Sequence, residues 1–374
     1  MAGLDGTLRA MRITAVTATT CVVPLPRPII MGEIRFDARE YIVVEITADT
    51  GQTGIGFGMT RNSPVTSIVD RSLAPFLVGK DPLLTEAHWE AAYYRNLPMG
   101  QRGIFMRALS AVDIALWDLK GQAAGLPIWK LLGGARERVP VSVAGGYPAS
   151  DRTQAELDAE MADYAEQGFR TVKLAAGELA EDTVRLRAAR RVLGPDIALA
   201  HDVHWAFRDL ASVVPTVRSW ADIDIAFLED PFPTELVALS VKLREQTGAR
   251  IALGEDSTGR WAFRDLLLDH SPDLLRLDAT VAGGLSEAAK ICALASTLGV
   301  PVFPHVFPEV HIHLGAAFPG IQMVEMTDPT YQTETLYQLF QEWVKVENGN
   351  MIAPETPGLG VVLDRAAMER FAVR

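Results

Sequence analysis

Hydrophobic and polar residues alternate in the first part of the chain, and apolar residues then recur at helical spacing. The alternation in MRITAVTATTCVVPL (11–25) and YIVVEITADTGQTGIGFG (41–58) predicts two or three antiparallel strands, with a turn at Asp49–Gly51. The clearest helical run extends from about Phe105 to Ala124 and ends near Gly125. Strands followed by helices indicate a small α+β domain.

A different pattern begins after Gly134, where short β-rich runs alternate with helical stretches. The runs are VPVSVAGG, RTVKLAA, DIALAHDVH, IAFLEDP, ARIALGED, LLRLDAT, VPVFPH and IQMVE. Eight such runs are what a closed (β/α)₈ barrel requires, whereas an open doubly wound sheet would bring a G-x-G-x-x-G turn that is not found here. We therefore predict an α/β fold, with an α+β domain over 11–134 and a modified TIM barrel over 135–335. The segment 336–374 is expected to return to the first domain, and residues 1–10 to be a loose leader.

The charge balance excludes some partners. Of the 374 residues, 35 are Lys or Arg and 47 are Asp or Glu, so the net charge is −12. A chain this acidic is a poor candidate for binding nucleic acid or an anionic membrane surface. With no apolar run of about 18 residues and no signal-peptide core, we expect a cytoplasmic protein. Cys21 and Cys292 lie far apart, and a buried free thiol is preferred over a disulfide for Cys292.

Ionisable residues recur at the ends of the predicted barrel strands, where the catalytic groups of such barrels are located. Consecutive members of this set are about one βα unit apart. Chance does not readily explain this regular spacing, because charged residues normally lie on the exposed surfaces of helices at irregular positions. The residues are Lys173, Asp202, Glu229, Glu255, Asp278, His305 and Glu325.

Three of these residues, Asp202, Glu229 and Glu255, end adjacent strands, so their carboxylates should converge. Carboxylates this close repel one another unless a cation lies among them. Ligands that are all oxygen favour a hard ion, Mg²⁺ before Mn²⁺. The alternative is that each acid caps a helix or pairs with a basic neighbour.

Asp278 and His305 lie on neighbouring strands, which predicts an imidazole oriented by a carboxylate and able to act as a base or acid. The alternative is a structural histidine. Glu325, one strand further on, is placed to hydrogen-bond a substrate carboxylate oxygen and help hold the charge of an enediolate.

Strand alternation predicts which neighbouring side chains share a face. Lys173 should face the site together with Ala175, and Asp202 together with His204. His204 is then a second proton-transfer group or a substrate contact, with a packing role as the alternative.

Two histidine clusters have a weaker resemblance to zinc sites. His305, His311 and His313 lack a tetrahedral ligand spacing, and His201 and His204 lack the H-x-H spacing of barrel hydrolases. A zinc site is therefore disfavoured.

At these residues the chain resembles the mandelate racemase branch of the enolase superfamily, over nearly its whole length from Met11. The matching segments are ALSAVDIALWDLKGQAAGLPIWKLLGG (108–134), GFRTVKLAAG (168–177), DVH (202–204), LEDP (228–231), GED (254–256), LDATVAGGLSEAAKI (277–291) and PHVF (304–307). The resemblance implies that residues 11–134, completed by the C-terminal segment, form a capping domain. It also implies that Asp202, Glu229 and Glu255 bind the metal, that His305 and Asp278 form a base-acid dyad, and that Glu325 is the electrophilic partner. Members of this superfamily use a Lys or His base with one or two Mg²⁺ ions.

The chain departs from that family at strand two. Lys173-Leu174-Ala175 stands where the family usually has Lys-x-Lys, so the base on the face opposite the histidine is missing. Racemisation needs a proton-transfer group on each face, and it is disfavoured here unless Lys173 takes over. The Asp-x-His sequence at Asp202 and His204 is also found in some sugar-acid dehydratases of the superfamily, where the histidine transfers a proton.

We therefore expect a lyase that dehydrates a sugar acid, an aldonate or an aldarate, to a 2-keto-3-deoxy acid. One alternative is a cycloisomerase or racemase using Lys173 and His305, and another is a catalytically silent family member that binds a ligand. The expected partners are a small-molecule carboxylate and, by resemblance, further copies of the chain in a dimer or octamer. Substrate choice is expected from the loops around 31–36 and 56–61, in which Arg35 and Arg61 are candidate contacts or solvated surface charges.

Overall fold

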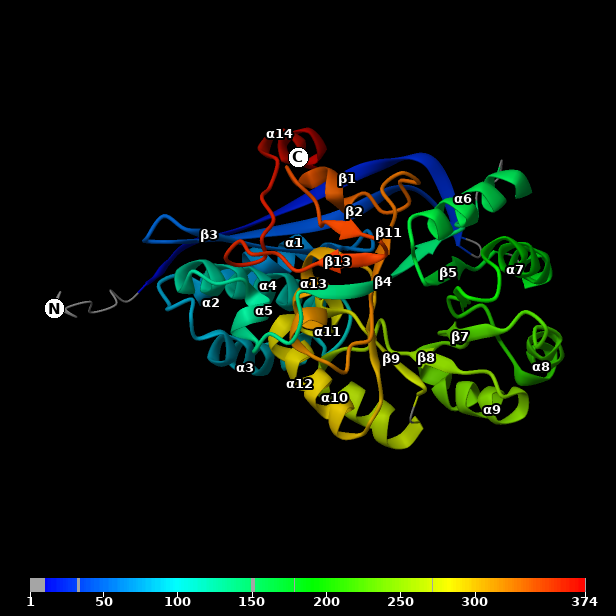
Figure 1. Cartoon of the computed structure of the whole chain (residues 1–374). Coiled ribbons are helices and arrows are strands. Elements are labelled where there is room, and N and C mark those ends of the chain that lie inside the picture. Colours follow the sequence, from blue (N-terminus) through cyan, green and yellow to red (C-terminus); the bar gives the residue numbers. More distant parts are fainter. Residues whose placement is uncertain (1–10, 32–33, 149–151, 178, 271, 374) are drawn as a thin grey trace.

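Figure 1 shows the computed structural model, which describes residues 11–31, 34–148, 152–177, 179–270 and 272–373. The predicted leader, residues 1–10, lies outside the described residues. Two bodies of secondary structure lie side by side: a three-stranded sheet with its helices, and a larger ring of strands surrounded by helices.

The first body, the cap, is an antiparallel sheet in the order β1 (Ile13–Met31), β2 (Ile34–Ala48) and β3 (Thr53–Met59). The predicted long helix is α4 (Ile104–Ala124), which packs against β3. Gly54 and Gly56 allow this close approach, because a Cβ atom at either position would overlap the carbonyl oxygens of Ala115 and Ala111. The shorter helices of the cap are α1 (Val65–Ile68), α2 (Ala74–Leu77), α3 (Thr85–Arg95) and α5 (Ile128–Leu131), with a π-helical turn at Val69–Leu73.

Eight parallel strands in the described part of the chain form the second body, and each of the eight predicted runs contributes one of them. Each strand from β4 to β10 pairs with the next, and β11 pairs with β4 to close the ring. An isolated backbone bridge connects Val302 of β10 with Ile321, three residues before β11 begins. The strands are β4 (Arg138–Gly145), β5 (Thr171–Ala175), β6 (Ala198–Asp202), β7 (Ile225–Glu229), β8 (Ile251–Leu253), β9 (Leu274–Leu277), β10 (Val302–Pro304) and β11 (Val324–Thr327).

Helices connect successive strands, as the barrel requires. They are α6 (Gln154–Glu166), α7 (Leu179–Leu193), α8 (Leu210–Ser219), α9 (Val237–Thr247), α10 (Gly259–Asp265), α11 (Ala279–Ala282), α12 (Gly284–Thr297) and α13 (Pro308–Ala317). The predicted fold class is confirmed, with one modification. After β11 the described chain forms a 3₁₀ turn at Leu336–Leu339 in place of an eighth barrel helix.

The tail then contacts both bodies. Strands β12 (Val346–Glu347) and β13 (Asn350–Ile352) form a hairpin, and β13 pairs antiparallel with the first half of β4. The last helix, α14 (Arg365–Phe371), lies against β1, where Ala372 forms a bridge with Cys21.

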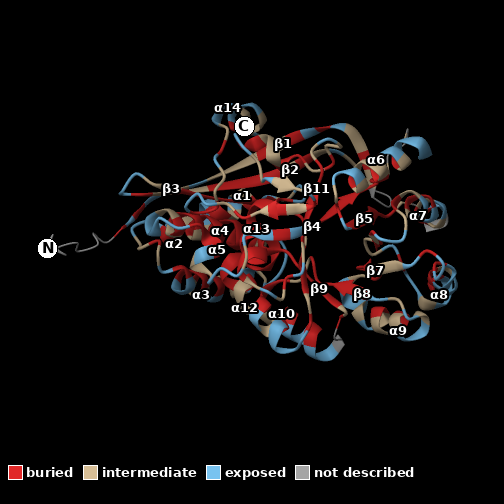
Figure 2. Ribbon diagram, viewed as in Figure 1, coloured by how far each residue is buried: buried red, intermediate tan, exposed pale blue. Residues whose placement is uncertain are grey.

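Burial follows this architecture. Figure 2 shows buried residues along the strands and on the inner faces of the helices, with exposed residues on the outer helices. One hydrophobic cluster lies within the cap, and a larger one extends from the barrel into the cap, where it includes Tyr41, Val43 and Phe57. Cys21 and Cys292 are both buried free thiols. Among the described residues, no helix combines the length and apolar character needed to cross a membrane.

Polar contacts fix the cap beside the carboxyl ends of the barrel strands. Asp113 on α4 accepts hydrogen bonds from the backbone N–H (2.9 Å) and the hydroxyl (2.7 Å) of Ser286, near the start of α12. Ser110, one turn earlier, accepts a hydrogen bond from the N–H of Gly283. Because buried polar groups are costly without partners, these contacts specify how α4 is placed over the barrel.

Candidate active site

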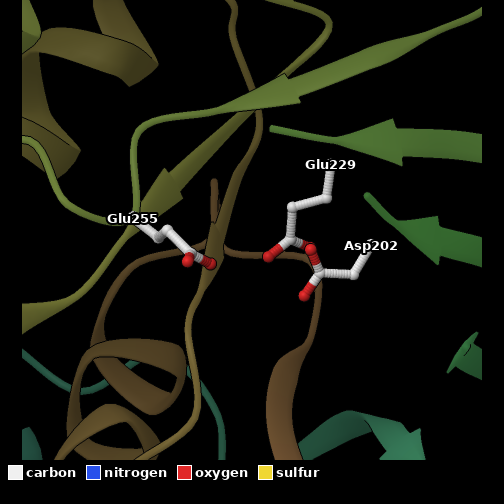
Figure 3. A group of neighbouring side chains, drawn as sticks. All are labelled: Asp202, Glu229 and Glu255. Carbon is white, nitrogen blue, oxygen red and sulfur yellow. The ribbon is translucent and has the colours of Figure 1, made fainter. Parts of the chain in front are cut away.

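The three predicted carboxylates converge at one end of the barrel. Asp202 and Glu229 are the last residues of β6 and β7, and Glu255 follows β8 by two positions. All three are buried, and one oxygen of each lies within 4.8 Å of one oxygen of the other two. Figure 3 shows the three side chains pointing from separate strands toward a common centre.

Two buried cations contact part of this cluster from within the barrel. The Lys173 ammonium lies 3.2 Å from Asp202, 2.9 Å from Glu229 and 3.1 Å from Glu325. Burial alone would lower the pKa of Lys173, but these carboxylates hold it well above 10.5. In this arrangement Lys173 is therefore a protonated counter-ion for the three carboxylates.

Arg276 is the second cation, and the sequence analysis did not include it. It is fully buried, with its guanidinium 3.0 Å from Glu229 and 2.8 Å from Glu325. The signal was present, because alternation along β9 places Arg276 on the same face as Asp278 two residues later. Glu325 is thus bound to both cations and also accepts a hydrogen bond from the N–H of Val306.

The remaining charges fit a divalent metal ion. The carboxylates of Asp202, Glu229, Glu255 and Glu325 face two cations, which leaves an excess of two negative charges. One oxygen each of Glu229 and Glu255 is buried without a hydrogen bond. Burial raises the pKa of Glu255 well above its ordinary value, and the neighbouring charges of Glu229 and Asp202 raise it further. A hard cation bound to these oxygens would relieve both the repulsion and the missing contacts.

The structure also brings His305 and Asp278 together. Nδ1 of His305 lies 3.0 Å from Asp278, and Nε2 lies 3.4 Å from Glu255. The other oxygen of Asp278 accepts hydrogen bonds from the backbone N–H and hydroxyl of Thr280, which fixes the carboxylate. Burial, with the positive charges of Arg276 and Lys173, lowers the pKa of His305 well below 6.5. The imidazole is therefore neutral near pH 7 and its Nε2 faces the carboxylate cluster.

His204 reaches the site by a route that strand alternation does not describe. Strand β6 ends at Asp202, and His204 has a left-handed backbone with φ of 45°. Its N–H donates a 3.0 Å hydrogen bond to Asp202, and its ring lies 4.4 Å from the ring of Trp205. His204 lines a cavity of about 400 Å³ between the cap and the barrel, together with Phe36, Ala38, Arg39, Glu40, Met59, Arg61, Asn62, Arg107, Trp205 and Asp256.

The other histidines have structural partners. His311 accepts a hydrogen bond from the N–H of Ala279 and faces the carbonyl of Val306. His313 likewise accepts from the N–H of Trp129 and faces the carbonyl of Leu359. His201 lies between the carbonyl of Leu174 and the carboxylate of Asp182, outside the carboxylate cluster. These contacts occupy the ring nitrogens that a zinc site would need.

The flank of the site beside Ala175 is apolar. Ala175 forms a buried cluster with Leu25 and Ile29 of the cap and with Tyr147, and Phe36 packs against it. Hydrophobic side chains therefore contact the position where a second lysine was expected by resemblance. A charge borders the cluster, because the Arg39 guanidinium lies over the Phe36 ring, 5.1 Å from its centre.

Comparison with known proteins places this geometry in a family. Residues 13–133 match the mandelate racemase/muconate lactonizing enzyme N-terminal domain, and residues 156–367 match the enolase C-terminal domain-like family. The chain belongs to the mandelate racemase/muconate lactonizing enzyme group of the enolase superfamily.

Several relatives are similar over most of their length. An arabinonate dehydratase of Saccharolobus solfataricus is 30% identical over 89% of this chain and 90% of the relative. A D-galactarolactone cycloisomerase of Agrobacterium fabrum is 31% identical over 96% of this chain and 99% of the relative. Among solved structures, a racemase from Streptomyces coelicolor with bound magnesium has a TM-score of 0.89, with 30% identity over 96% of this chain and 100% of the other. An L-talarate dehydratase of a Polaromonas species, complexed with magnesium and L-glucarate, has a TM-score of 0.87, with 28% identity over 97% and 98%.

Proposed function

We propose that the protein is a Mg²⁺-dependent dehydratase that converts a sugar acid, an aldonate or an aldarate, to a 2-keto-3-deoxy acid. The observation that carries the proposal is the contact of His305 with Asp278 beside three converging carboxylates, while Ala175 lies in a hydrophobic cluster. Relatives named as arabinonate and L-talarate/galactarate dehydratases support the reaction class. Solved relatives with bound magnesium support the metal.

Asp202, Glu229 and Glu255 would hold the Mg²⁺ ion. When bound, the ion supplies positive charge to the substrate carboxylate, which acidifies the C2 proton. Nε2 of His305 takes that proton, since the lowered pKa keeps the imidazole in its basic form. Asp278 fixes the ring tautomer and balances the charge that His305 gains. Lys173 and Arg276 hold the Glu325 carboxyl group in place beneath the site.

The C3 hydroxyl then leaves as water. It receives the proton that His305 took from C2, so one dyad serves first as base and then as acid. The resulting enol of the product tautomerises to the 2-keto acid as C3 takes up a proton from water and the enol proton is released. Burial lowers the pKa of His204, so His204 is assigned a substrate contact and not the role of proton donor.

Proton NMR in D₂O tests the proposal with the purified protein, Mg²⁺ and a panel of aldonic and aldaric acids. A 2-keto-3-deoxy product that requires Mg²⁺ is the expected result, and it also names the substrate. Exchange at C2 without elimination would instead support an isomerase, and no exchange with any acid would support a ligand-binding member of the family.

A cycloisomerase is the second candidate, because two of the relatives carry that name. It needs only the His305 side of the site, whereas a racemase would also need a base on the other flank. Lys173 does not meet that need, since it is buried against three carboxylates. Lactones and anhydro sugar acids added to the NMR panel separate the cycloisomerase from the dehydratase.

We also propose that the chain is a cytoplasmic homo-oligomer, a dimer or an octamer, as its family resemblance implies. Light scattering coupled to size-exclusion chromatography measures the mass directly. A monomer at micromolar concentration would contradict this proposal without affecting the proposed reaction.

A further inference from the structure

Tyr147 lies where the Ala175 flank meets the substrate side of the barrel. It follows the end of β4 by two residues, and β4 is the immediate neighbour of β5, which carries Lys173 and Ala175. Its side chain is only 7% exposed and packs with Leu25, Ile29 and Ala175. Both the cap and the barrel therefore enclose the ring.

The hydroxyl of Tyr147 is unpaired in the part of the chain that the structure describes. It makes no hydrogen bond with any described residue, and its oxygen keeps some exposure to solvent. A buried tyrosine normally finds a partner for its hydroxyl, because leaving the group unpaired costs free energy. An enclosed ring with an open, unpaired hydroxyl is consistent with a partner that arrives from outside the chain.

Packing places Tyr147 beside the site, because the ring contacts the cluster of Ala175 and the residue follows β4, which pairs with the strand that carries Lys173. Lys173 and Glu325 of the barrel, and Arg39 and Glu334 at the cap, also act on its hydroxyl. Arg39 also lines the 400 Å³ cavity, as does Phe36, which packs against the Tyr147 cluster. Burial raises the pKa of the phenol well above 10, so the group is a neutral hydrogen-bond donor at physiological pH and not a base.

We propose that Tyr147 is a substrate-contacting residue whose hydroxyl donates a hydrogen bond to a hydroxyl group of the sugar acid on the Ala175 flank. This inference rests on the proposed function. The contact holds the substrate on the flank that lacks a lysine and turns its C2–H bond toward His305. No proton is transferred at Tyr147, so the enzyme binds both flanks of the substrate but moves protons at one.

The test is Tyr147→Phe, which removes the hydroxyl and keeps the packed ring. We expect kcat/KM for the sugar acid to fall about tenfold, the usual effect of deleting one hydrogen bond, while the melting temperature stays within a few degrees. Tyr93→Phe is the matched control. Tyr93 is 5% exposed, stacks on Trp89 and Trp261 in the cap region and also lacks a hydroxyl partner, so its loss should leave kcat/KM unchanged.

Deoxygenated substrates identify the contact and exclude a purely structural effect. Each analogue lacks one hydroxyl group of the substrate. For the wild type, kcat/KM should be about tenfold lower with the analogue that lacks the contacted hydroxyl than with the other analogues. For Tyr147→Phe, which cannot make that contact, this difference should disappear. If the wild type turns over a sugar acid and Tyr147→Phe keeps full activity, or discriminates against every analogue as the wild type does, the inference about Tyr147 is wrong and the proposed function stands. If the wild type turns over no acid in the panel, the proposed function fails and this inference fails with it.

Discussion

The two flanks of the site are built from different parts of the molecule and carry different chemistry. On one flank, His305, Asp278 and Glu255 follow barrel strands and contact one another through charged or ionisable groups. On the other, Ala175 of the barrel meets Leu25 and Ile29 of the cap in an apolar cluster. Under the proposed function, proton transfer takes place on the barrel flank, while the cap contributes enclosure.

This difference limits the reaction more than the fold does. The same superfamily fold serves racemases, cycloisomerases and dehydratases, as the names of the relatives show. A site with proton-transfer groups on one flank suits reactions in which a proton leaves and returns on the same side. The identity of residue 175 is thus more informative about the reaction than the three converging carboxylates are.

Removing the base from the charged flank should have the largest effect. We expect His305→Asn to lower kcat by roughly 10³-fold or more, at the upper part of the range for general acid–base catalysis, and to abolish C2 exchange in D₂O. Turnover near the wild-type rate would rule out His305 as the base.

The same residue sets the expected pH dependence. Burial lowers the pKa of His305 below 6.5, so its basic form persists to lower pH than that of an exposed histidine. The kcat/KM profile of the wild type should therefore remain on its plateau through pH 6.5 and fall only at lower pH.

Removing one of the two buried cations, Arg276, should mainly affect the stability of the fold. Arg276→Met leaves Glu229 and Glu325 buried with one counter-ion fewer, which should lower the free energy of unfolding by about 3–5 kcal/mol. Urea unfolding measures this change. The exposed pair of Arg35 and Asp37 gives the control, because Arg35→Met should cost less than about 1 kcal/mol. Equal effects of the two substitutions would show that the buried network does not stabilise the fold.

Removing the residue that orients the base should have a smaller effect than removing the base. In Asp278→Asn the amide still accepts from Thr280 but no longer balances an imidazolium, so kcat should fall by roughly 10–100-fold. Steady-state kinetics with the substrate found by NMR measures the fall. A loss as large as that of His305→Asn would mean that Asp278 contacts the reacting atoms.

The smallest change should occur on the apolar flank. Ala175→Ser adds a hydroxyl but no proton-transfer group of suitable pKa, so kcat/KM should change less than about threefold. Chiral chromatography should detect no epimer of the substrate at C2. If the wild type formed an epimer, the proposed difference between the two flanks would be wrong, because epimer formation requires a proton donor on the Ala175 flank.

The sequence predicted the barrel and the carboxylate cluster for a physical reason. Each unit of one parallel strand and its helix has a nearly constant length. Asp202, Glu229 and Glu255 therefore occupy the same position, near the strand end, in successive units, and their spacing in the sequence indicates this. The helix α4 was also predicted closely, because its apolar positions recur over five turns.

The remaining features depend on where the chain leaves regular structure or on contacts between distant segments. Strand alternation could not place His204, which lies beyond β6 with a left-handed backbone. Strand alternation does predict which face of β9 Arg276 occupies. Its burial could not be predicted, because a buried arginine is rare unless it is paired, and its partner Glu229 lies on another strand. The apolar surroundings of Ala175 require residues from the cap, and no local pattern connects Leu25 or Ile29 with β5.

The bridge between Cys21 and Ala372 also bears on how the protein is made. Strand β1 leaves the ribosome well before Ala372, which follows Cys21 by 351 residues (372 minus 21). At roughly 5–20 residues per second, that interval is about 20–70 s. Until then the edge of β1 at Cys21 has no partner from the tail, and exposed strand edges invite pairing with other chains. Fast synthesis or chaperone binding at β1 should accordingly increase the yield of native protein more than changes within the barrel helices.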